Sequence, residues 1–245
     1  MKIIQVGAIS TGTVILLGIA MVIPAFLQPT QQLLVLLSFD VLDQGNTPEW
    51  CKELSSVLSK HNVKAVVFVA GKTADQYPEC VSGFSNNVDI GSQTYDYVEL
   101  ASIHDYAAQL EQVKSGKIAV DRAGNLDSKV FKAPFGATDE NIYSLLSSSG
   151  ILADFSYQTQ YNKYYKDQFI KFDLDSYEGL EESTEYYQKL KPEEGPVVIN
   201  FDNHTPTEKI DQFVSKLKSS HIRFVSASEL TGIDLTVKEG EWRLQ

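Results

Sequence analysis

The chain has 245 residues, of which 43% are hydrophobic and 22% charged, so it is long enough to bury a full-sized core. Its 21 basic and 32 acidic residues give a formal net charge of −11, and the lysines and arginines form no cluster. Because binding to a phosphate backbone needs concentrated positive charge, this composition excludes a nucleic-acid partner.

Residues 1–32 are predicted to form a membrane anchor and a short linker. No charged residue occurs between Ile3 and Phe39, and residues 8–27 are a mostly apolar stretch long enough to span a bilayer. Lys2 precedes this stretch and no basic residue follows closely, so we expect the N-terminus in the cytoplasm and the domain outside the cell. The alternative is a cleaved signal peptide. The length of the apolar region argues against it, because the region is longer than a usual signal core.

The first half of the remaining chain alternates strands with helices. In chain order we predict a strand at 33–41, a helix at 46–60, a strand at 64–69, a helix at 74–83, a strand at 88–92 and a helix at 102–120. The helix at 46–60 has Thr47 as its expected N-cap and Pro48 at its first position. The strand at 33–41 is an apolar run that ends at Asp40 and Val41, as expected of a buried parallel strand.

The second half continues the alternation. We predict strands at 129–134, 152–156, 169–173, 196–202 and 221–225, and helices at 138–146, 180–190 and 207–219. Thr138 is the expected cap of its helix, and a tyrosine-rich loop covers 157–165. No structure is predicted for the tail, residues 231–245.

This alternation predicts one α/β domain over residues 33–230, with a mainly parallel sheet that closes into a barrel. The residues that follow each strand then gather at one face. That face would display Asp40 and Val41, residues 93–97, residues 132–135, the tyrosine-rich loop and residues 201–204. The tyrosine-rich loop suits a sugar-stacking platform, a partner surface or a lid over the barrel mouth.

The two cysteines are Cys51 and Cys80. In a domain outside the cell they are candidates for a disulfide, and the alternative is a pair of buried thiols.

Several motifs resemble those of polysaccharide deacetylases of the NodB-homology type, in carbohydrate esterase family 4, from about residue 33 to residue 230. The matching segments are Ser38-Phe-Asp40, Gly91-Ser-Gln-Thr-Tyr95, Phe131-Lys-Ala-Pro-Phe-Gly136 and Arg223-Phe-Val-Ser-Ala-Ser-Glu-Leu230. The resemblance implies a distorted TIM-like barrel. It also implies removal of acetyl groups from chitin-like or peptidoglycan-like polymers.

The resemblance also identifies the positions at which the family does its chemistry. The three metal-ligand positions fall on Val41, Gln93 and Tyr97, and the catalytic acid position falls on Phe201. The family's base matches Asp40, and the arginine that orients it matches Lys132. The ligands are thus replaced together, so no cofactor is expected.

Two interpretations of the site remain. In the preferred one, Asp40 is a structural carboxylate held by Lys132 or by backbone N–H groups, and the mouth binds a ligand through residues drawn from Gln93, Tyr97, Lys132, Phe135, Asp202 and His204. In the other, Asp40, Asp96, Asp202 and His204 hold a zinc ion in a rebuilt site. Asn203 begins an Asn-x-Thr sequence and is a candidate for N-glycosylation.

The sequence therefore favours a membrane-anchored homologue of the deacetylases outside the cell that no longer hydrolyses its substrate. It would bind envelope glycan, or act as a scaffolding subunit of a membrane-protein complex, while residues 8–27 contact lipid. The alternative is an active deacetylase with a non-standard metal site, which would hydrolyse the amide bond of N-acetyl sugars.

Overall fold

Strand β1 (Leu33–Val41) is the centre of the sheet in the computed structural model, which describes residues 32–156, 170–171, 176–178, 196–218 and 221–231. β1 runs parallel to β2 (Ala65–Val69) on one side and to β8 (Val197–Asp202) on the other. In this register Asp40 lies opposite Phe68 of β2 and Asp202 of β8. The carboxyl ends of the three strands therefore lie together.

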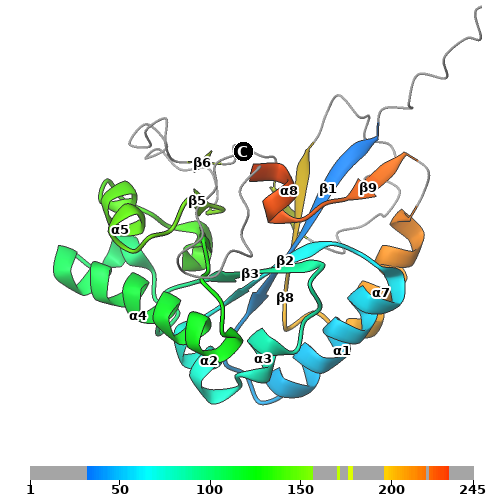
Figure 1. Cartoon of the computed structure of the whole chain (residues 1–245), viewed down its shortest axis with the longest axis horizontal. Coiled ribbons are helices and arrows are strands. Elements are labelled where there is room, and N and C mark those ends of the chain that lie inside the picture. Colours follow the sequence, from blue (N-terminus) through cyan, green and yellow to red (C-terminus); the bar gives the residue numbers. More distant parts are fainter. Residues whose placement is uncertain (1–31, 157–169, 172–175, 179–195, 219–220, 232–245) are drawn as a thin grey trace, which may run out of the picture. The chain divides into compact units, whose positions relative to one another are not determined.

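The remaining strands extend the sheet on both sides (Figure 1). They are β3 (Val88–Ser92), β4 (Val130–Phe131), β5 (Ala153–Asp154), β6 (Ile170–Lys171), β7 (Ser176–Glu178) and β9 (Ile222–Phe224). The strand order is β6-β5-β4-β3-β2-β1-β8-β7, with β9 paired to the start of β1, and every pairing is parallel. The predicted α/β fold with a parallel sheet is confirmed.

The sheet curls as in a half barrel. No pairing joins β6 to β7 within the described ranges, so there the sheet is open rather than a closed barrel. β4, β5 and β6 each have only two residues, which is shorter than predicted, and β7 corresponds to no predicted strand.

Helices cover the outer face of the sheet, where α4, α2, α3, α1 and α7 follow one another in Figure 1. The helices are α1 (Thr47–His61), α2 (Gly71–Gln76), α3 (Glu79–Ser82), α4 (Tyr106–Gly124), α5 (Ile142–Ser148), α7 (Thr207–Leu217) and α8 (Ala227–Thr231), with 3-10 turns η1 (Leu100–Ser102) and η2 (Pro134–Gly136).

The alternation of side chains along β1 divides the core between the two faces of the sheet. Val35, Leu37, Phe39 and Val41 belong to the larger cluster, which includes residues of α1 and α7. Leu36 belongs to a second cluster on the inner side of the curl, with Val66, Phe68, Val130, Phe155, Val198 and Ala227. On the inner face of the sheet, apolar residues therefore precede Asp40 along the strand.

Two of the predicted helices have different boundaries in the structure. α4 begins at Tyr106 instead of residue 102, because the Asp105 carboxylate accepts a hydrogen bond from the Ala108 N–H at 2.7 Å and caps the helix. The helix predicted over 74–83 is two helices, α2 and α3, separated at Tyr77 and Pro78.

Two predicted caps are wrong. Thr47 is the first residue of α1, after Asn46, and its Oγ1 accepts a hydrogen bond from the Gln44 N–H, outside the helix. α5 begins at Ile142, after Asn141, so Thr138 does not cap it.

Some predictions fall on residues outside the described ranges: the anchor at 8–27, the tyrosine-rich loop, the helix at 180–190 and the tail beyond residue 231. None of the helices in the described part of the chain combines the length and the apolar character that a membrane crossing requires. The described residues belong to the compact unit of residues 31–245.

Candidate functional site

Asp40 and Asp202 stand side by side at the carboxyl ends of β1 and β8. The two residues are direct register partners in neighbouring parallel strands. Leu36 and Val198, which lie four residues before them, belong to the inner apolar cluster. Since side chains alternate along a strand, both carboxylates lie on the inner side of the curl, at the edge where parallel barrels carry their functional residues.

Lys132 follows β4 and reaches across the mouth to Asp40. Its ammonium donates hydrogen bonds to Oδ2 of Asp40 at 2.7 Å and to Oδ1 of Asn200 at 3.0 Å, and lies 5.8 Å from the centre of the Phe68 ring. The side chain of Lys132 is 2% exposed and that of Asp40 is 14% exposed. Burial raises the pKa of the Asp40 carboxyl, and the Lys132 ammonium acts in the opposite direction. The predicted contact of Lys132 with Asp40 is confirmed.

Gln93, the first residue after β3, completes the contacts of Asp40. Its Nε2 donates to Oδ1 of Asp40 at 3.2 Å, and its residue exposure is 0%. Its Oε1 is buried and has no hydrogen-bond partner in the part of the chain that the structure describes. A buried carbonyl oxygen of this kind has a strong requirement for a donor.

The backbone of Gln93 is held by a close approach of α4. A Cβ atom added to Gly116 would lie 2.1 Å from the carbonyl oxygen of Gln93, and one added to Gly71 would lie 2.7 Å from the Cα of Gly116. Only glycine allows this proximity, so α2 and α4 fix the position of the loop after β3.

Tyr97 and Phe135 form an aromatic pair at the mouth. Their ring centroids lie 5.3 Å apart at an interplanar angle of 62°, and Phe135 is 67% exposed. Both residues have positive φ angles, 56° for Tyr97 and 59° for Phe135, a conformation that costs about 1–3 kcal/mol outside glycine and is enriched at functional sites. The pKa of the Tyr97 phenol is raised by burial and then by the negative charges of Asp40 and Asp202, so the phenol is neutral near pH 7.

Asp202 is tied to the loop that follows it. Its Oδ1 accepts a hydrogen bond from the His204 N–H at 2.9 Å, and its Oδ2 lies 3.2 Å from Nδ1 of His204. Nε2 of His204 lies 2.8 Å from Nε2 of Gln44, in the loop after β1. His204 is therefore a surface contact between two mouth loops.

The residues at the family's metal-ligand positions do not fit a divalent metal ion. Val41 is fully buried in the outer apolar cluster, the nitrogen of the Gln93 amide faces Asp40, and the phenol of Tyr97 is neutral. Among the described residues no group of three or more His, Cys, Asp or Glu side chains lies close enough to hold an ion. Asp96, part of the alternative metal set, instead accepts a hydrogen bond from Nε2 of Gln112 at 2.8 Å.

Phe201, at the position of the family's catalytic acid, is a core residue. Its ring stacks on Phe39 at 5.3 Å and contacts Phe213 of α7 edge-on at 5.4 Å. A side chain in this position packs β8 against α7 and supplies no proton.

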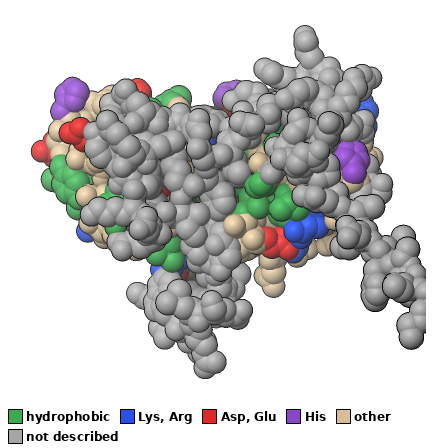
Figure 2. All heavy atoms as spheres, turned by 90° about the horizontal axis from the view of Figure 1, so that it is seen from above, with side chains coloured by type: hydrophobic (Ala, Val, Ile, Leu, Met, Phe, Trp, Pro, Cys, Tyr) green, Lys and Arg blue, Asp and Glu red, His purple; other side chains and the backbone are tan. Residues whose placement is uncertain are grey.

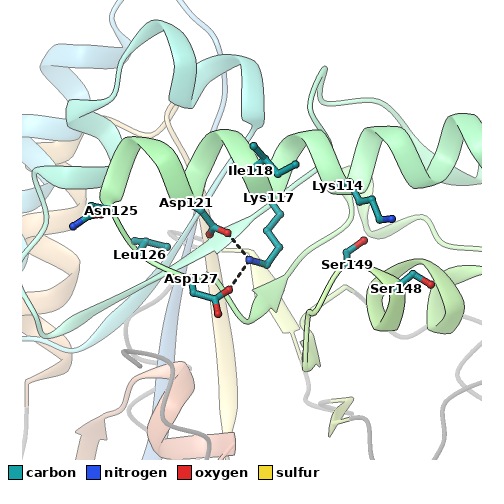
Figure 3. Close-up of a pocket in the computed structure, with 9 residues that line it drawn as sticks. All are labelled: Lys114, Lys117, Ile118, Asp121, Asn125, Leu126, Asp127, Ser148 and Ser149. Carbon is teal, nitrogen blue, oxygen red and sulfur yellow. Dashed lines mark hydrogen bonds and ion pairs between the residues drawn. The ribbon is translucent and has the colours of Figure 1, made fainter. Parts of the chain in front are cut away.

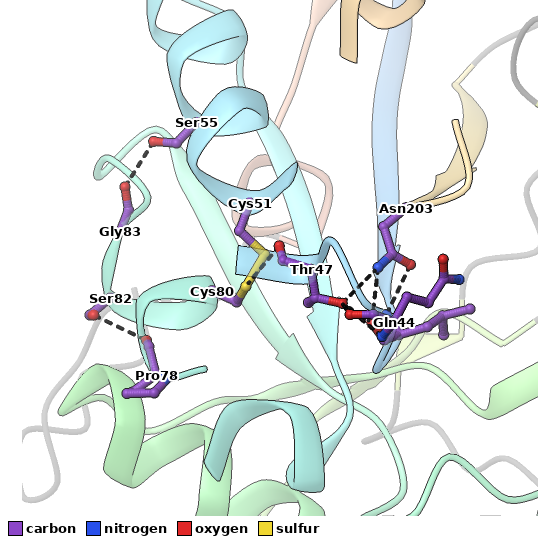
Figure 4. Close-up of a disulfide and its surroundings, with 10 residues drawn as sticks. Gln44, Thr47, Cys51, Ser55, Pro78, Cys80, Ser82, Gly83 and Asn203 are labelled. Atoms are coloured by element: carbon purple, nitrogen blue, oxygen red, sulfur yellow. Dashed lines mark hydrogen bonds between the residues drawn. A yellow bond between two sulfur atoms is a disulfide. The ribbon is translucent and has the colours of Figure 1, made fainter. Parts of the chain in front are cut away.

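Cys51 of α1 and Cys80 of α3 form a buried disulfide beside the loop after β1 (Figure 4). The Sγ atom of Cys80 lies 3.7 Å from the carbonyl oxygen of Thr47.

Asn203 is buried, and its amide donates to the Leu42 carbonyl at 2.9 Å and accepts from the Leu42 N–H at 3.2 Å. A glycan on Asn203 would require these bonds to break. The Asn-x-Thr pattern predicts a glycosylation site and does not indicate this structural role.

A separate cavity of about 540 Å³ lies beside α4 and α5 (Figure 3). In it the Lys117 ammonium contacts the carboxylates of Asp121 and Asp127. The lining residues include none of those around Asp40.

Figure 2 shows one face of the molecule, and its described side chains are of mixed type with no large basic patch.

A sequence model of the family described as Polysaccharide deacetylase matches residues 28–153. A peptidoglycan-N-acetylglucosamine deacetylase of Bacillus cereus is 30% identical over 118 residues, which are 48% of this chain and 42% of the relative. The peptidoglycan-N-acetylglucosamine deacetylase PgdA of Listeria monocytogenes is 24% identical over 197 residues, 80% of this chain and 39% of the relative. The chain thus spans about two fifths of the length of these curated relatives.

Solved structures show the same fold. The T48 deacetylase with substrate has a TM-score of 0.59 at 19% identity, over 84% of this chain and 94% of that one. A CE4 family pseudoenzyme from Bacillus anthracis has a TM-score of 0.58 at 15% identity, over 82% of this chain and 66% of that one. A mutant of that pseudoenzyme with restored enzymatic activity also has a TM-score of 0.58, at 16% identity. At these identities the likeness concerns the fold alone.

Proposed function

The chain belongs to the polysaccharide deacetylase family, and we propose that it binds envelope glycan without hydrolysing it. In this proposal the mouth of the curled sheet is the binding site, and Asp40 organises it instead of acting as a base. The chain would act outside the cell as a glycan-binding or scaffolding subunit, anchored by residues 8–27. The substrates named for the relatives support a glycan as ligand.

The observation that carries this proposal is the loss of metal ligands together with the catalytic acid. Val41 and Phe201 are both buried in the outer apolar cluster. Gln93 uses its amide nitrogen on Asp40. A general base at Asp40 would therefore act alone.

The energetic difference between the two situations is large. A bound zinc ion lowers the pKa of its water from about 15.7 to about 7, which corresponds to roughly 12 kcal/mol of nucleophile activation. A carboxylate acting as general base contributes only about 10²–10⁴-fold, roughly 3–5 kcal/mol. Asp40 cannot replace the metal ion.

The residues left at the mouth are suited to contact a sugar. The exposed ring of Phe135 and the half-buried ring of Tyr97 offer apolar faces, and Asp202 offers a hydrogen-bond acceptor. Apolar faces with a few polar groups beside them are typical of sites for small polar molecules.

The decisive experiment measures acetate release from acetylated chito-oligosaccharides and from peptidoglycan, with and without added zinc. We expect no release above the level of the Asp40→Asn variant. Metal-dependent release that Asp40→Asn abolishes would refute the proposal. It would favour the second candidate, an active deacetylase with a non-standard zinc site, for which the retained pair Asp40 and Asp202 is the supporting observation.

A sedimentation assay separates glycan binding from a purely scaffolding role. The full chain, solubilised in detergent, is mixed with insoluble peptidoglycan or chitin and centrifuged. Co-sedimentation of the isolated chain supports glycan binding. Recovery in the supernatant, together with co-purification of a membrane protein, would support the scaffolding role.

A further inference from the structure

The charges at the mouth do not cancel. Asp40 and Asp202 contribute two carboxylates from adjacent strands, and Lys132 contributes one ammonium. Lys132 is 2% exposed and donates to Asp40 and Asn200, so its charge is less accessible to a ligand than the charge of Asp202. The side chain of Asp202 is 42% exposed. His204 is the other titratable group beside Asp202, with its Nδ1 3.2 Å from Oδ2 of Asp202.

A second, independent observation also points to a ligand that donates hydrogen bonds. Oε1 of Gln93 is a buried acceptor with no partner among the described residues. The nitrogen of the same amide donates a hydrogen bond to Asp40, so this amide is in direct contact with one of the two carboxylates. The polar groups around Asp40 are then mostly acceptors: the carboxylates of Asp40 and Asp202, and the buried amide oxygen of Gln93, which has no donor among the described residues.

From these observations, and resting on the glycan-binding function proposed above, we infer that the mouth recognises the protonated amino group of a de-N-acetylated amino sugar. An ammonium group has three donors and one positive charge. It matches the surplus negative charge and the acceptor character of these groups. An N-acetyl group would instead present its own carbonyl oxygen to these acceptors, with a single N–H to offer in return.

The aromatic pair supports the same ligand. A sugar ring stacked on Phe135 would place its substituents near Tyr97, because the two ring centroids lie 5.3 Å apart. A cation above an aromatic face gains further attraction. The site would therefore select glycan from which acetyl groups have already been removed.

The test compares the affinity of the full chain for a short glucosamine oligomer with that for the N-acetylglucosamine oligomer of equal length, by calorimetry near neutral pH and physiological salt. We expect the glucosamine oligomer to bind about 10- to 100-fold more tightly, the range of one charged hydrogen bond. Asp202→Asn should reduce this preference to within about twofold of unity. Asp43→Asn is the matched control, since it removes one exposed carboxylate from the neighbouring loop and should retain the preference.

The outcomes are distinguishable. Equal or tighter binding of the N-acetylated oligomer would overturn the inference and leave glycan binding intact. Binding of neither oligomer would refute the proposed function itself, and the inference with it. Because the chain is acidic, a lysine oligomer of equal charge serves as a probe of non-specific attraction. If it binds as tightly as the glucosamine oligomer, and Asp202→Asn has no more effect than Asp43→Asn, the inference also fails.

Discussion

The Nζ atom of Lys132 lies 2.7 Å from Oδ2 of Asp40, although the two residues are 92 positions apart. Lys132 follows β4 and Asp40 ends β1, so the contact spans the mouth across β2 and β3. The ammonium is almost fully buried, and Asn200 accepts a second hydrogen bond from it. This pair links the two sides of the curl.

Breaking the pair should destabilise the chain strongly. Lys132→Met leaves the Asp40 carboxylate buried without its cation, and such changes typically cost about 3–5 kcal/mol. We expect this loss in the free energy of unfolding by urea, and a smaller loss when Asp40→Asn is added. Lys60→Met is the control, because Lys60 is an exposed partner of Asp211 and should lose at most about 1 kcal/mol. Equal losses for Lys132→Met and Lys60→Met would contradict the assigned role.

Gly116→Ala should destabilise the loop that carries Gln93. Alanine gains about 1 kcal/mol of helix propensity, but its Cβ would lie 2.1 Å from the Gln93 carbonyl oxygen. Overpacking typically costs about 1–3 kcal/mol, so we expect a net loss of up to about 2 kcal/mol in urea unfolding. Gly45→Ala, where nothing lies within 4 Å, is the matched control and should be near neutral. A stabilised Gly116→Ala variant would show that the approach is not tight.

The Cys51–Cys80 disulfide should contribute substantially to stability. The two cysteines are 29 positions apart, and loop-closure entropy for this separation corresponds to about 3–4 kcal/mol. We expect reductant to lower the melting temperature of the chain. The double variant Cys51→Ala/Cys80→Ala should have a lower melting temperature that reductant does not change. Because both sulfurs are buried, reduction of the native fold should be slow.

Tyr97 should make stability depend on alkaline pH. Burial, and then Asp40 and Asp202, raise its pKa above the ordinary value of about 10, so the folded chain keeps a proton that the unfolded chain loses. The corresponding stability is fully present below about pH 10 and is lost as pH rises through the folded-state pKa.

The free energy of unfolding of the native chain should therefore fall relative to Tyr97→Phe above about pH 10. Urea unfolding of both proteins at matched pH values measures this difference, with Tyr106→Phe as a control for the loss of one phenol. Parallel pH profiles for the native chain and Tyr97→Phe would show that Tyr97 titrates alike in both states.

The sequence predicted the central strands well because buried parallel strands are nearly continuous apolar runs. The observed β1 matches the predicted range, and β2, β3 and β8 differ from theirs by at most one residue at an end. The short strands β4 to β7 were harder to locate, since a two-residue strand has no periodicity. Helix starts depended on single side chains such as Asp105, whose capping bond sequence spacing does not reveal.

At the site, the position of Asp40 and its contact with Lys132 followed from the strand pattern and the family motifs. The hydrogen bonds of Gln93 and Asn200 did not, because they depend on side chains in β1 and β8 and just after β3 and β4 coming together in space. The role of Asn203 was also missed, since its bonds with Leu42 join residues 161 positions apart.

The register of β1 with β8 has a consequence for folding. β1 has one neighbour, β2, that is close in sequence, but its other neighbours, β8 and β9, begin only at Val197 and Ile222. Contacts of such long sequence separation form slowly, because the loop must close before the pairing stabilises it. The mouth with its Asp40–Asp202 pair therefore forms late, and a nascent chain that has not yet reached β8 exposes one edge of its most apolar strand.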